Sequence, residues 1–374
     1  MKIKIPVYEP FLDEEESKCV LSALAHREIS GSRGEYINKF EEGFSHYSDC
    51  SYGIATSSGT SALHLAVASL GIGDKDEVLV SSFTNMATFF AVLYLQAKPF
   101  PIDIEPDTWN INPTLIEEKI NENTKAIMVV HIYGHPVDMD PILSVAKKYG
   151  LYIIEDCAEA HGALYKGKKV GSLGDVGCFS FYANKIITTG EGGMLTTNSV
   201  EIANKARSLR SLAFGASMKF MHEDVGFNYR MTNLQAAIGC AQLKKIDKII
   251  KQKREISRYY SEGLKDIPGL QLPVEKAYAK NVYWMYHVVL NEEFGCTRDV
   301  VMKKLGDAGI ETRESFIPYN MQEIFIKRGW VRGDECPVAN YVAKNGFYLP
   351  SSPLLKNEEL EYIIKKIKQI QKGE

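Results

Sequence analysis

Seven short apolar runs, separated by segments of helical periodicity, dominate the first half of the chain. Strands are expected at residues 52–55, 77–80, 98–103, 126–131, 151–156, 177–181 and 193–197. Between most of them apolar residues recur every three or four positions, as at residues 138–149, which indicates helices with one buried face. Alternating strands and helices predict an α/β fold, with a largely parallel central sheet that helices cover on both faces.

The last third of the chain follows a different pattern. A long, charged amphipathic stretch at residues 233–264 is expected to be one helix that leaves the sheet. One strand and two helices follow, at residues 281–290, 298–308 and 358–371. We therefore expect a large domain over residues 1–245 and a smaller C-terminal α+β domain over residues 246–374, in line with the length of the chain.

Charge and cysteine content narrow the class of protein. The chain has 374 residues, of which 44 are basic and 47 acidic, so no basic surface for nucleic acid is expected. It starts without a charged leader and apolar stretch, and no segment approaches the roughly twenty apolar residues of a membrane span. Seven scattered cysteines without a Cys-x-x-Cys pair indicate reduced thiols. We expect a cytoplasmic protein that binds neither nucleic acid nor membrane.

Lys185 is the first candidate for chemistry. It follows the strand expected at residues 177–181 and precedes the glycine-rich segment TTGEGG at residues 188–193. A lysine amine condenses with an aldehyde cofactor only when the amine is held in place and partly desolvated. A strand end followed by a tight turn provides such a place, although a lysine after a strand is also a common solvated surface residue.

Asp156 ends the strand expected at residues 151–156, 29 residues before Lys185. Pyridoxal phosphate acts as an electron sink while its ring nitrogen stays protonated, and a fixed carboxylate beside that nitrogen keeps it so. Asp156 is our candidate for this role. The alternative is an acid that solvates the end of a strand.

The segment ATSSGTS at residues 55–61 is a candidate phosphate site. It lies between a strand and the helix expected at residues 62–70, so Ser58, Gly59 and Thr60 would offer free backbone amides and the positive end of a helix dipole. The hydroxyl of Ser180, five residues before the lysine, could reach the same phosphate. The alternative is an ordinary helix cap.

These features occur in the same order and at the same intervals in enzymes of the aspartate-aminotransferase type. The chain resembles the sugar aminotransferases of the DegT group and, within that group, the perosamine synthases. The resemblance also covers residues 130–136, 154–160, 165–168, 187–194 and 226–233. It implies the aspartate-aminotransferase-like fold (fold type I), pyridoxal 5′-phosphate as cofactor, and a homodimer with active sites at the interface. The implied reaction moves an amino group from L-glutamate to the keto carbon of a nucleotide-linked 4-keto-6-deoxy sugar.

The resemblance also implies a role for each site residue. Lys185 bears the cofactor and moves the proton, Asp156 pairs with the pyridine nitrogen, and Glu159 lies near the cofactor hydroxyl. Phosphate contacts are implied for Ser58, Gly59, Thr60, Ser180 and Asn228 of the partner subunit. Related members carry a histidine in place of this lysine and remove a hydroxyl group, so the lysine favours transamination.

Several positions depart from the family pattern. Asn85 stands where an aromatic residue normally stacks on the cofactor ring, which leaves open a cofactor-binding homologue without turnover. Near the expected sugar-nucleotide position, the loop at residues 29–34 is one residue longer, and Glu28, Glu314 and Asn320 replace a tryptophan, a proline and a histidine. These departures leave open a different acceptor, a small phosphorylated ketone.

Arg33, Arg230 and Arg313 are candidate substrate-binding residues. A guanidinium can grip a phosphate or carboxylate by paired hydrogen bonds, although each of the three could equally be an ion-paired surface arginine.

His131 and His135 have the spacing of a metal site on a helix. Gly134 and Pro136 argue against a helix there. We therefore expect no metal site.

Overall fold

A seven-stranded sheet forms the centre of the protein. The structure is a computed structural model that describes residues 4–215, 218, 220–222, 224–331 and 335–374. The strand order is β1-β9-β8-β5-β4-β2-β3, and within the sheet only β9 runs antiparallel to its neighbours. The strands are β1 (Tyr52–Thr56), β2 (Glu77–Ser81), β3 (Lys98–Ile102), β4 (Thr124–Val130), β5 (Tyr152–Asp156), β8 (Val176–Ser180) and β9 (Gly193–Thr197). The predicted α/β class and all seven predicted strands are confirmed.

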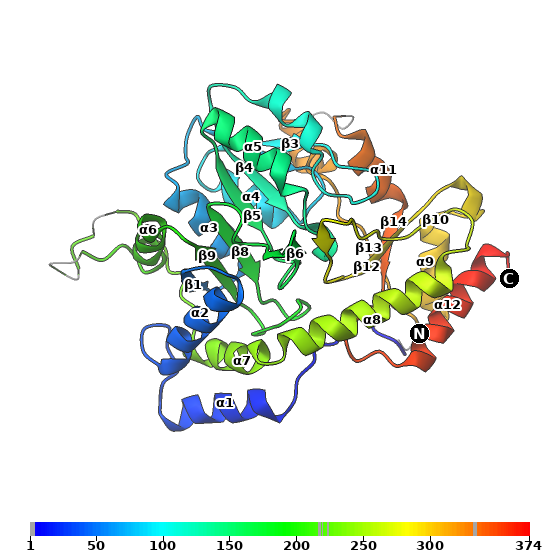
Figure 1. Ribbon diagram of the computed structural model, residues 1–374, viewed down its shortest axis with the longest axis horizontal. Coiled ribbons are helices and arrows are strands. Elements are labelled where there is room, and N and C mark those ends of the chain that lie inside the picture. Colours follow the sequence, from blue (N-terminus) through cyan, green and yellow to red (C-terminus); the bar gives the residue numbers. More distant parts are fainter. Residues whose placement is uncertain (1–3, 216–217, 219, 223, 332–334) are drawn as a thin grey trace.

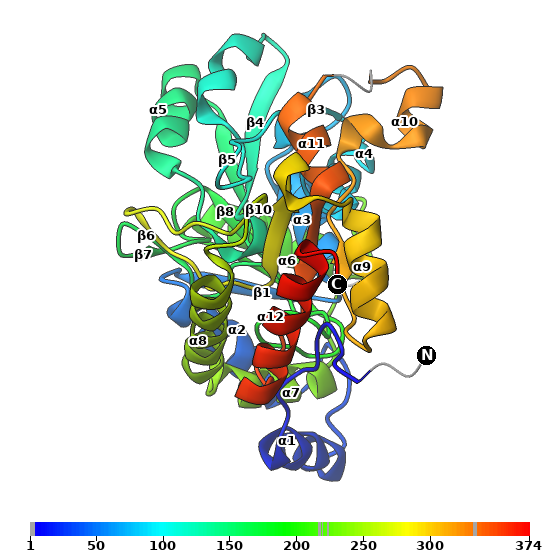
Figure 2. The same ribbon diagram turned by 90° about the vertical axis from the view of Figure 1, so that its right-hand side faces the viewer.

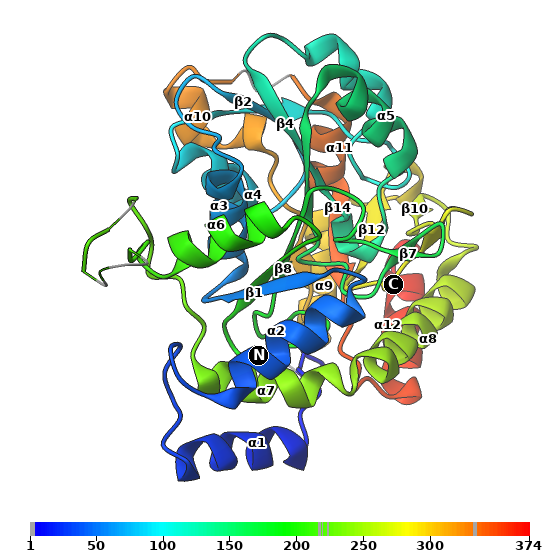
Figure 3. The ribbon, with the colours of Figure 1, turned by 60° about the vertical axis from the view of Figure 1, so that its left-hand side comes forward.

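Helices cover both faces of this sheet because its strands are apolar on both sides. In β2, Val78 and Val80 pack in one core cluster, whereas Leu79 between them packs in a different cluster, on the side of α5. Figure 3 shows β1 lying between α2 and α6. The helices of this part are α1 (Glu14–Ala25), α2 (Glu35–Tyr47), α3 (Gly59–Ser69), α4 (Met86–Leu93), α5 (Met139–Tyr149), α6 (Val200–Arg210) and α7 (Asn233–Leu243).

A smaller C-terminal unit has its own sheet and core. Its sheet is antiparallel, in the order β10-β12-β14-β13, and α8, α9 and α12 pack against it (Figures 1 and 2). Its elements are α8 (Ile246–Leu264), β10 (Leu270–Gln271), β12 (Tyr286–Leu290), α9 (Arg298–Asp307), β13 (Arg313–Glu314), α10 (Glu323–Lys327), α11 (Pro337–Asn345), β14 (Gly346–Leu349) and α12 (Asn357–Gln371). A third small sheet joins β11 (Ala279–Lys280), β6 (Leu164–Tyr165) and β7 (Lys168–Lys169).

Two sequence predictions were wrong in this region. The single helix expected at residues 233–264 is two helices, because α7 packs against α1 and α2 whereas α8 buries Tyr260 and Leu264 in the C-terminal core. The strand expected at residues 281–290 begins only at residue 286, because the amides of Val282 and Trp284 before it donate to the loop that follows β4.

The division after residue 245 stays a prediction. That point coincides with the start of α8, but Ile5 near the N-terminus pairs with Ile310 of the C-terminal unit. Within the described residues, every helix is too short or too polar to cross a bilayer.

Tyr133 and Gly134 join the two units at the end of β4. Tyr133 accepts a hydrogen bond from the amide of Trp284 (2.9 Å), and Gly134 accepts one from the amide of Val282 (3.2 Å). Both residues have left-handed backbone angles, with φ of 51° at Tyr133 and 97° at Gly134. This contact draws Trp284 of the C-terminal unit toward the ends of the parallel strands.

The tight fit at Gly134 predicts a large loss of stability in Gly134→Ala. A Cβ there would lie 2.8 Å from Cγ2 of Val282 and 3.0 Å from the amides of Tyr283 and Trp284. Gly150→Ala is the matched control, because Gly150 also has a positive φ (66°) but would meet nothing within 4 Å. We expect Gly150→Ala to lose about 1 kcal/mol of unfolding free energy and Gly134→Ala about 1–3 kcal/mol more. Urea unfolding measures both, and equal losses would contradict the packing described.

Candidate active site

A cavity of about 310 Å³ opens at the carboxyl ends of three parallel strands. The final residues of these strands, Val130 of β4, Asp156 of β5 and Ser180 of β8, all line it. Ligands of open α/β sheets bind at this edge. The cavity also brings together most of the residues predicted from the sequence, namely Ser58, Gly59, Thr60, Asn85, Glu159 and Lys185.

Lys185 has a desolvated amine. Its Nζ lies 4.0 Å from Oε1 of Glu159 and 3.9 Å from the centroid of the Trp284 ring. Burial lowers the pKa of Lys185, and the neighbouring Glu159 opposes this shift. A lower pKa leaves more of the amine uncharged, which is the form that attacks a carbonyl carbon.

Glu159 is a buried carboxyl group held from behind by the β4 loop. Its Oε2 accepts a hydrogen bond of 2.7 Å from the amide of Tyr133, and the left-handed backbone of Tyr133 aims this amide at it. Burial raises the pKa of Glu159, while the charge of Lys185 lowers it in part. The carboxyl group and the amine therefore control each other's charge.

The turn that carries Lys185 is fixed through its backbone. The amide of Lys185 donates to the carbonyl of Tyr182 (2.9 Å), and the carbonyl of Lys185 accepts from the hydroxyl of Tyr8 (2.7 Å). The indole Nε1 of Trp284 donates to the carbonyl of Asn184 (2.7 Å). Tyr8 and Trp284 lie far from Lys185 in the sequence, and no local pattern marks them as site residues.

Asp156 is almost fully buried at the end of β5. Its Oδ2 accepts from the hydroxyl of Thr88 (2.8 Å) and its Oδ1 from the amide of Ala158 (3.1 Å). Burial raises the pKa of Asp156, and these two hydrogen bonds lower it in part. A carboxylate in this setting gains from a cationic partner placed in the cavity.

The helix cap and the candidate phosphate site are the same segment. Ser58 caps α3 by a reciprocal pair of hydrogen bonds with Ser61. Gly59 and Thr60 follow in the first turn, where backbone amides have no partner within the helix. A Cβ on Gly59 would lie 2.6 Å from Cβ of Ser180, so the glycine lets α3 begin directly against the end of β8.

Asn85 lines the cavity as an exposed residue that caps α4, with its Oδ1 accepting from the amide of Ala87 (3.0 Å). Aromatic side chains reach the cavity from elsewhere, since Trp284, Phe316 and Tyr348 of the C-terminal unit line it. Sequence reasoning missed these three because the segments that carry them lie more than a hundred residues beyond most of the other site residues.

The remaining predicted site residues do not line this cavity. Asn228 is exposed, and its Oδ1 accepts from Arg230 (2.8 Å). Arg33 is exposed, and Arg313 forms an ion pair with Glu311 (2.6 Å). Within one chain these positions are therefore separate from Lys185.

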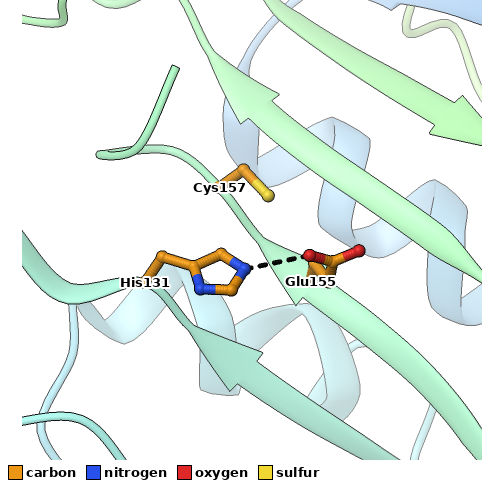
Figure 4. A group of neighbouring side chains, drawn as sticks. All are labelled: His131, Glu155 and Cys157. Carbon is orange, nitrogen blue, oxygen red and sulfur yellow. Dashed lines mark hydrogen bonds and ion pairs between the residues drawn. The ribbon is translucent and has the colours of Figure 1, made fainter. Parts of the chain in front are cut away.

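Three metal-binding residue types gather beside the site, as Figure 4 shows for His131, Glu155 and Cys157. Nδ1 of His131 accepts from the amide of Val137 (3.0 Å), so its Nε2 carries the proton and donates to Glu155 (3.0 Å). Glu155 also accepts three backbone amides, those of Gly171, Leu173 and Gly174. These hydrogen bonds hold Glu155, the residue before Asp156, in place and explain why His131 and Glu155 lie together. The expectation of no metal site stays a prediction.

Comparison with known proteins gives the family. A family model, the DegT/DnrJ/EryC1/StrS aminotransferase family, matches residues 10–368. The chain belongs to this family. It is 40% identical over 367 residues to a GDP-perosamine synthase of Escherichia coli O157:H7, and 41% identical over 368 residues to one of Caulobacter vibrioides. These alignments cover 98% of both chains in each pair.

Solved structures agree with this assignment. DesV of S. venezuelae superposes with a TM-score of 0.90 at 31% identity, covering 98% of this chain and 99% of DesV. The predicted family, fold type and cofactor are confirmed: the protein is a sugar aminotransferase of the DegT family that depends on pyridoxal 5′-phosphate.

The cavity fits the cofactor of this family. It offers the amides at the start of α3 for a phosphate, the buried carboxyl group of Asp156 for a cationic ring nitrogen, and the desolvated amine of Lys185 for an aldehyde. Three of the departures from the family pattern lie outside its lining. Glu28 accepts a hydrogen bond from Asn233 at its carbonyl, Glu314 lies in β13, and Asn320 donates to Asn340 (2.9 Å).

The Lys185 and Glu159 pair predicts a downward shift of the Lys185 pKa in Glu159→Gln. The carboxylate stabilises the charged amine, and two charges 4 Å apart interact by about 4 kcal/mol at an effective dielectric constant near 20, so the pKa should fall by up to about three units. The measurement is the pH dependence of Lys185 labelling in the cofactor-free protein by a small reagent that reacts with uncharged amines. Peptide mass spectrometry quantifies the label on Lys185. Glu191→Gln, which alters another cavity-lining carboxylate, should leave the midpoint unchanged. An unchanged or higher midpoint in Glu159→Gln would refute the coupling.

Proposed function

We propose that the protein transfers the amino group of L-glutamate to the keto carbon of a nucleotide-linked 4-keto-6-deoxy sugar, in the manner of a GDP-perosamine synthase. The observation that carries the proposal is the meeting of Lys185, Asp156 and Glu159 in one cavity beside the start of α3. The identity of 40–41% to GDP-perosamine synthases over nearly the whole chain supports this acceptor.

The predicted cofactor-binding residues of the cavity have the following roles in this proposal. The amides of Gly59 and Thr60, with the hydroxyl of Ser180, hold the phosphate of pyridoxal 5′-phosphate. The bound cofactor supplies an aldehyde carbon and an electron sink. Asp156 keeps the ring nitrogen protonated, and Glu159 lies near the cofactor hydroxyl.

Lys185 is the proposed base and acid. Its Nζ would take the proton from Cα of the amino donor and deliver it to the C4′ carbon of the cofactor, after which the donor leaves as a keto acid. With the keto acceptor the proton would move in the reverse direction. Burial beside Trp284 lowers the pKa of Lys185 and so favours the uncharged amine, whereas Glu159 stabilises the amine whenever it is charged.

We further propose a homodimer in which Asn228 completes the phosphate site of the partner subunit. Asn228 is exposed and lies outside its own cavity, in the segment of chain after α6, where it pairs with Ser211. This segment also exposes Met218, Met221 and Val225, and exposed apolar groups that gather on one segment mark a contact surface. An apolar groove of about 570 Å³ beside α1, which Leu12, Val20 and Leu21 line, adds a second surface for the other copy.

Arg33, Arg230 and Arg313 are the proposed substrate contacts. Each lies outside the cavity of its own chain, so they would contact only the part of a long acceptor that projects from the cavity, or the acceptor in the partner subunit. A guanidinium at these positions suits the diphosphate of a nucleotide sugar.

A small phosphorylated ketone is the second candidate acceptor. The departures from the family pattern at Glu28, Glu314, Asn320 and the longer loop at residues 29–34 favour it, because they fall near the expected sugar-nucleotide position. A homologue without turnover is disfavoured, since Lys185, Asp156 and Glu159 lie together in one cavity. All seven cysteines are free thiols, which supports the proposed cytoplasmic location.

The acceptor is tested by two parallel reactions with L-glutamate, one with GDP-4-keto-6-deoxymannose and one with dihydroxyacetone phosphate. We expect a 4-amino sugar and 2-oxoglutarate from the first reaction only, detected by mass spectrometry, because the remote nucleotide supplies binding energy for orientation. Amination of the small ketone alone would refute the sugar acceptor and leave the aminotransferase standing. If glutamate does not change the absorption spectrum of the bound cofactor, the result supports a cofactor-binding homologue without turnover.

The shared site predicts that two inactive variants restore each other. Lys185→Ala and Asn228→Asp should each lack activity, the second because it places a negative charge against the phosphate. A hybrid dimer contains one intact site, so random exchange should restore up to roughly a quarter of the native activity.

The control for this experiment mixes Lys185→Ala with Asp156→Asn. Both changes lie in the same chain's cavity, so hybrids of these two contain no intact site and should stay inactive. If sedimentation shows a monomer and this monomer has full activity, the shared site is contradicted.

A further inference from the structure

A strap of N-terminal residues connects the C-terminal unit with the turn of Lys185. Ile5 pairs with Ile310, the amide of Val7 donates to Glu311 (3.0 Å), and the carbonyl of Val7 accepts from the amide of Ser351 (2.9 Å). The carbonyl of Glu9 accepts from the hydroxyl of Ser352 (2.9 Å). We call residues 5–9 the strap. Figure 2 shows the N-terminal chain beside α9 and α12.

Tyr8 is the residue of the strap that reaches the active site. Its flanking residues Val7 and Glu9 are both bonded to the C-terminal unit, and its hydroxyl donates to the carbonyl of Lys185 (2.7 Å). Lys185 is therefore held at its carbonyl by a residue whose two neighbours in the chain are bonded to the C-terminal unit. This contact fixes the direction in which the Lys185 side chain leaves the backbone.

Lys253 of α8 contacts both the ring of Tyr8 and the loop that binds the strap. Its side chain is 2% exposed, its Nζ donates to the carbonyl of Ser351 (2.5 Å), and Nζ lies 5.1 Å from the centroid of the Tyr8 ring. No carboxylate is bonded to Lys253 within the described part of the chain. Burial without such a partner lowers its pKa to about 7, so the position costs free energy and calls for an explanation.

We propose that Tyr8 is a positioning residue for Lys185 and that Lys253 keeps Tyr8 in place, so that the C-terminal unit orients the amine that bears the cofactor. This inference rests on the proposed role of Lys185 and adds two residues that act through it. Neither Tyr8 nor Lys253 lines the cavity, so their effect must pass through the Lys185 turn.

Two forms of the cofactor separate positioning from general support. Pyridoxal 5′-phosphate needs the Lys185 amine for its full affinity, whereas pyridoxamine 5′-phosphate has no aldehyde and binds through its phosphate and ring alone. Tyr8→Phe removes one hydroxyl and leaves the ring. We expect it to weaken pyridoxal phosphate binding about two- to tenfold, the value of one hydrogen bond, and to leave pyridoxamine phosphate binding unchanged.

Tyr259→Phe is the matched control, because it removes a tyrosine hydroxyl that is bonded to Glu361 of α12 (2.9 Å) and not to the Lys185 turn. Lys253→Met keeps the aliphatic stem and should show the same selective loss. The double variant of Tyr8→Phe and Lys253→Met should lose little more than either alone, because the two residues act through one contact. If Lys253→Met fails to fold, the result with Tyr8→Phe still decides.

Lys185→Ala shows which proposal fails. If Lys185→Ala binds pyridoxal phosphate as tightly as the native protein, the assignment of Lys185 is wrong and the strap proposal falls with it. If Lys185→Ala weakens that binding but Tyr8→Phe weakens neither form or both forms equally, the strap proposal alone is overturned.

Discussion

The desolvation of one lysine amine is the constraint on which the rest of the structure depends. A lysine in water is charged at neutral pH and cannot attack an aldehyde. Here burial against the ring of Trp284 lowers the pKa of Lys185, and Glu159 at 4.0 Å limits the shift. Burial thus favours the uncharged amine and Glu159 favours the charged one, and a group that both accepts and donates a proton uses both forms.

This balance needs contributions from both structural units. The parallel sheet places Asp156 and Ser180 at adjacent strand ends and sets Glu159 just beyond β5. The C-terminal unit supplies Trp284, and its contact with the loop of Tyr133 also aims the amide that holds Glu159. A substitution at the junction between the units is therefore expected to change the pKa of the Lys185 amine, even though the substituted residue does not contact substrate.

The sequence predicted those features that have a local signal. The alternation of strands and helices predicted the parallel sheet. The phosphate segment, Asp156 and Lys185 each lie next to a predicted strand, in a sequence setting that can be recognised. Trp284 and Tyr8 could not be found in this way, because long-range packing alone brings them to Lys185. The break between α7 and α8 was missed for a similar reason, since one amphipathic pattern continues across two helices that pack against different units. The role of Asn228 depends on a second copy and stays a prediction.

Chemical trapping of the cofactor tests the central claim most directly. Borohydride reduction of the loaded enzyme fixes the cofactor on the lysine that bears it, and peptide mass spectrometry locates the label. Lys253 provides an internal comparison, because it is a buried lysine whose pKa is also lowered. The account predicts the label on Lys185 alone. A label on Lys253 or on any other lysine, with Lys185 unmodified, would contradict it.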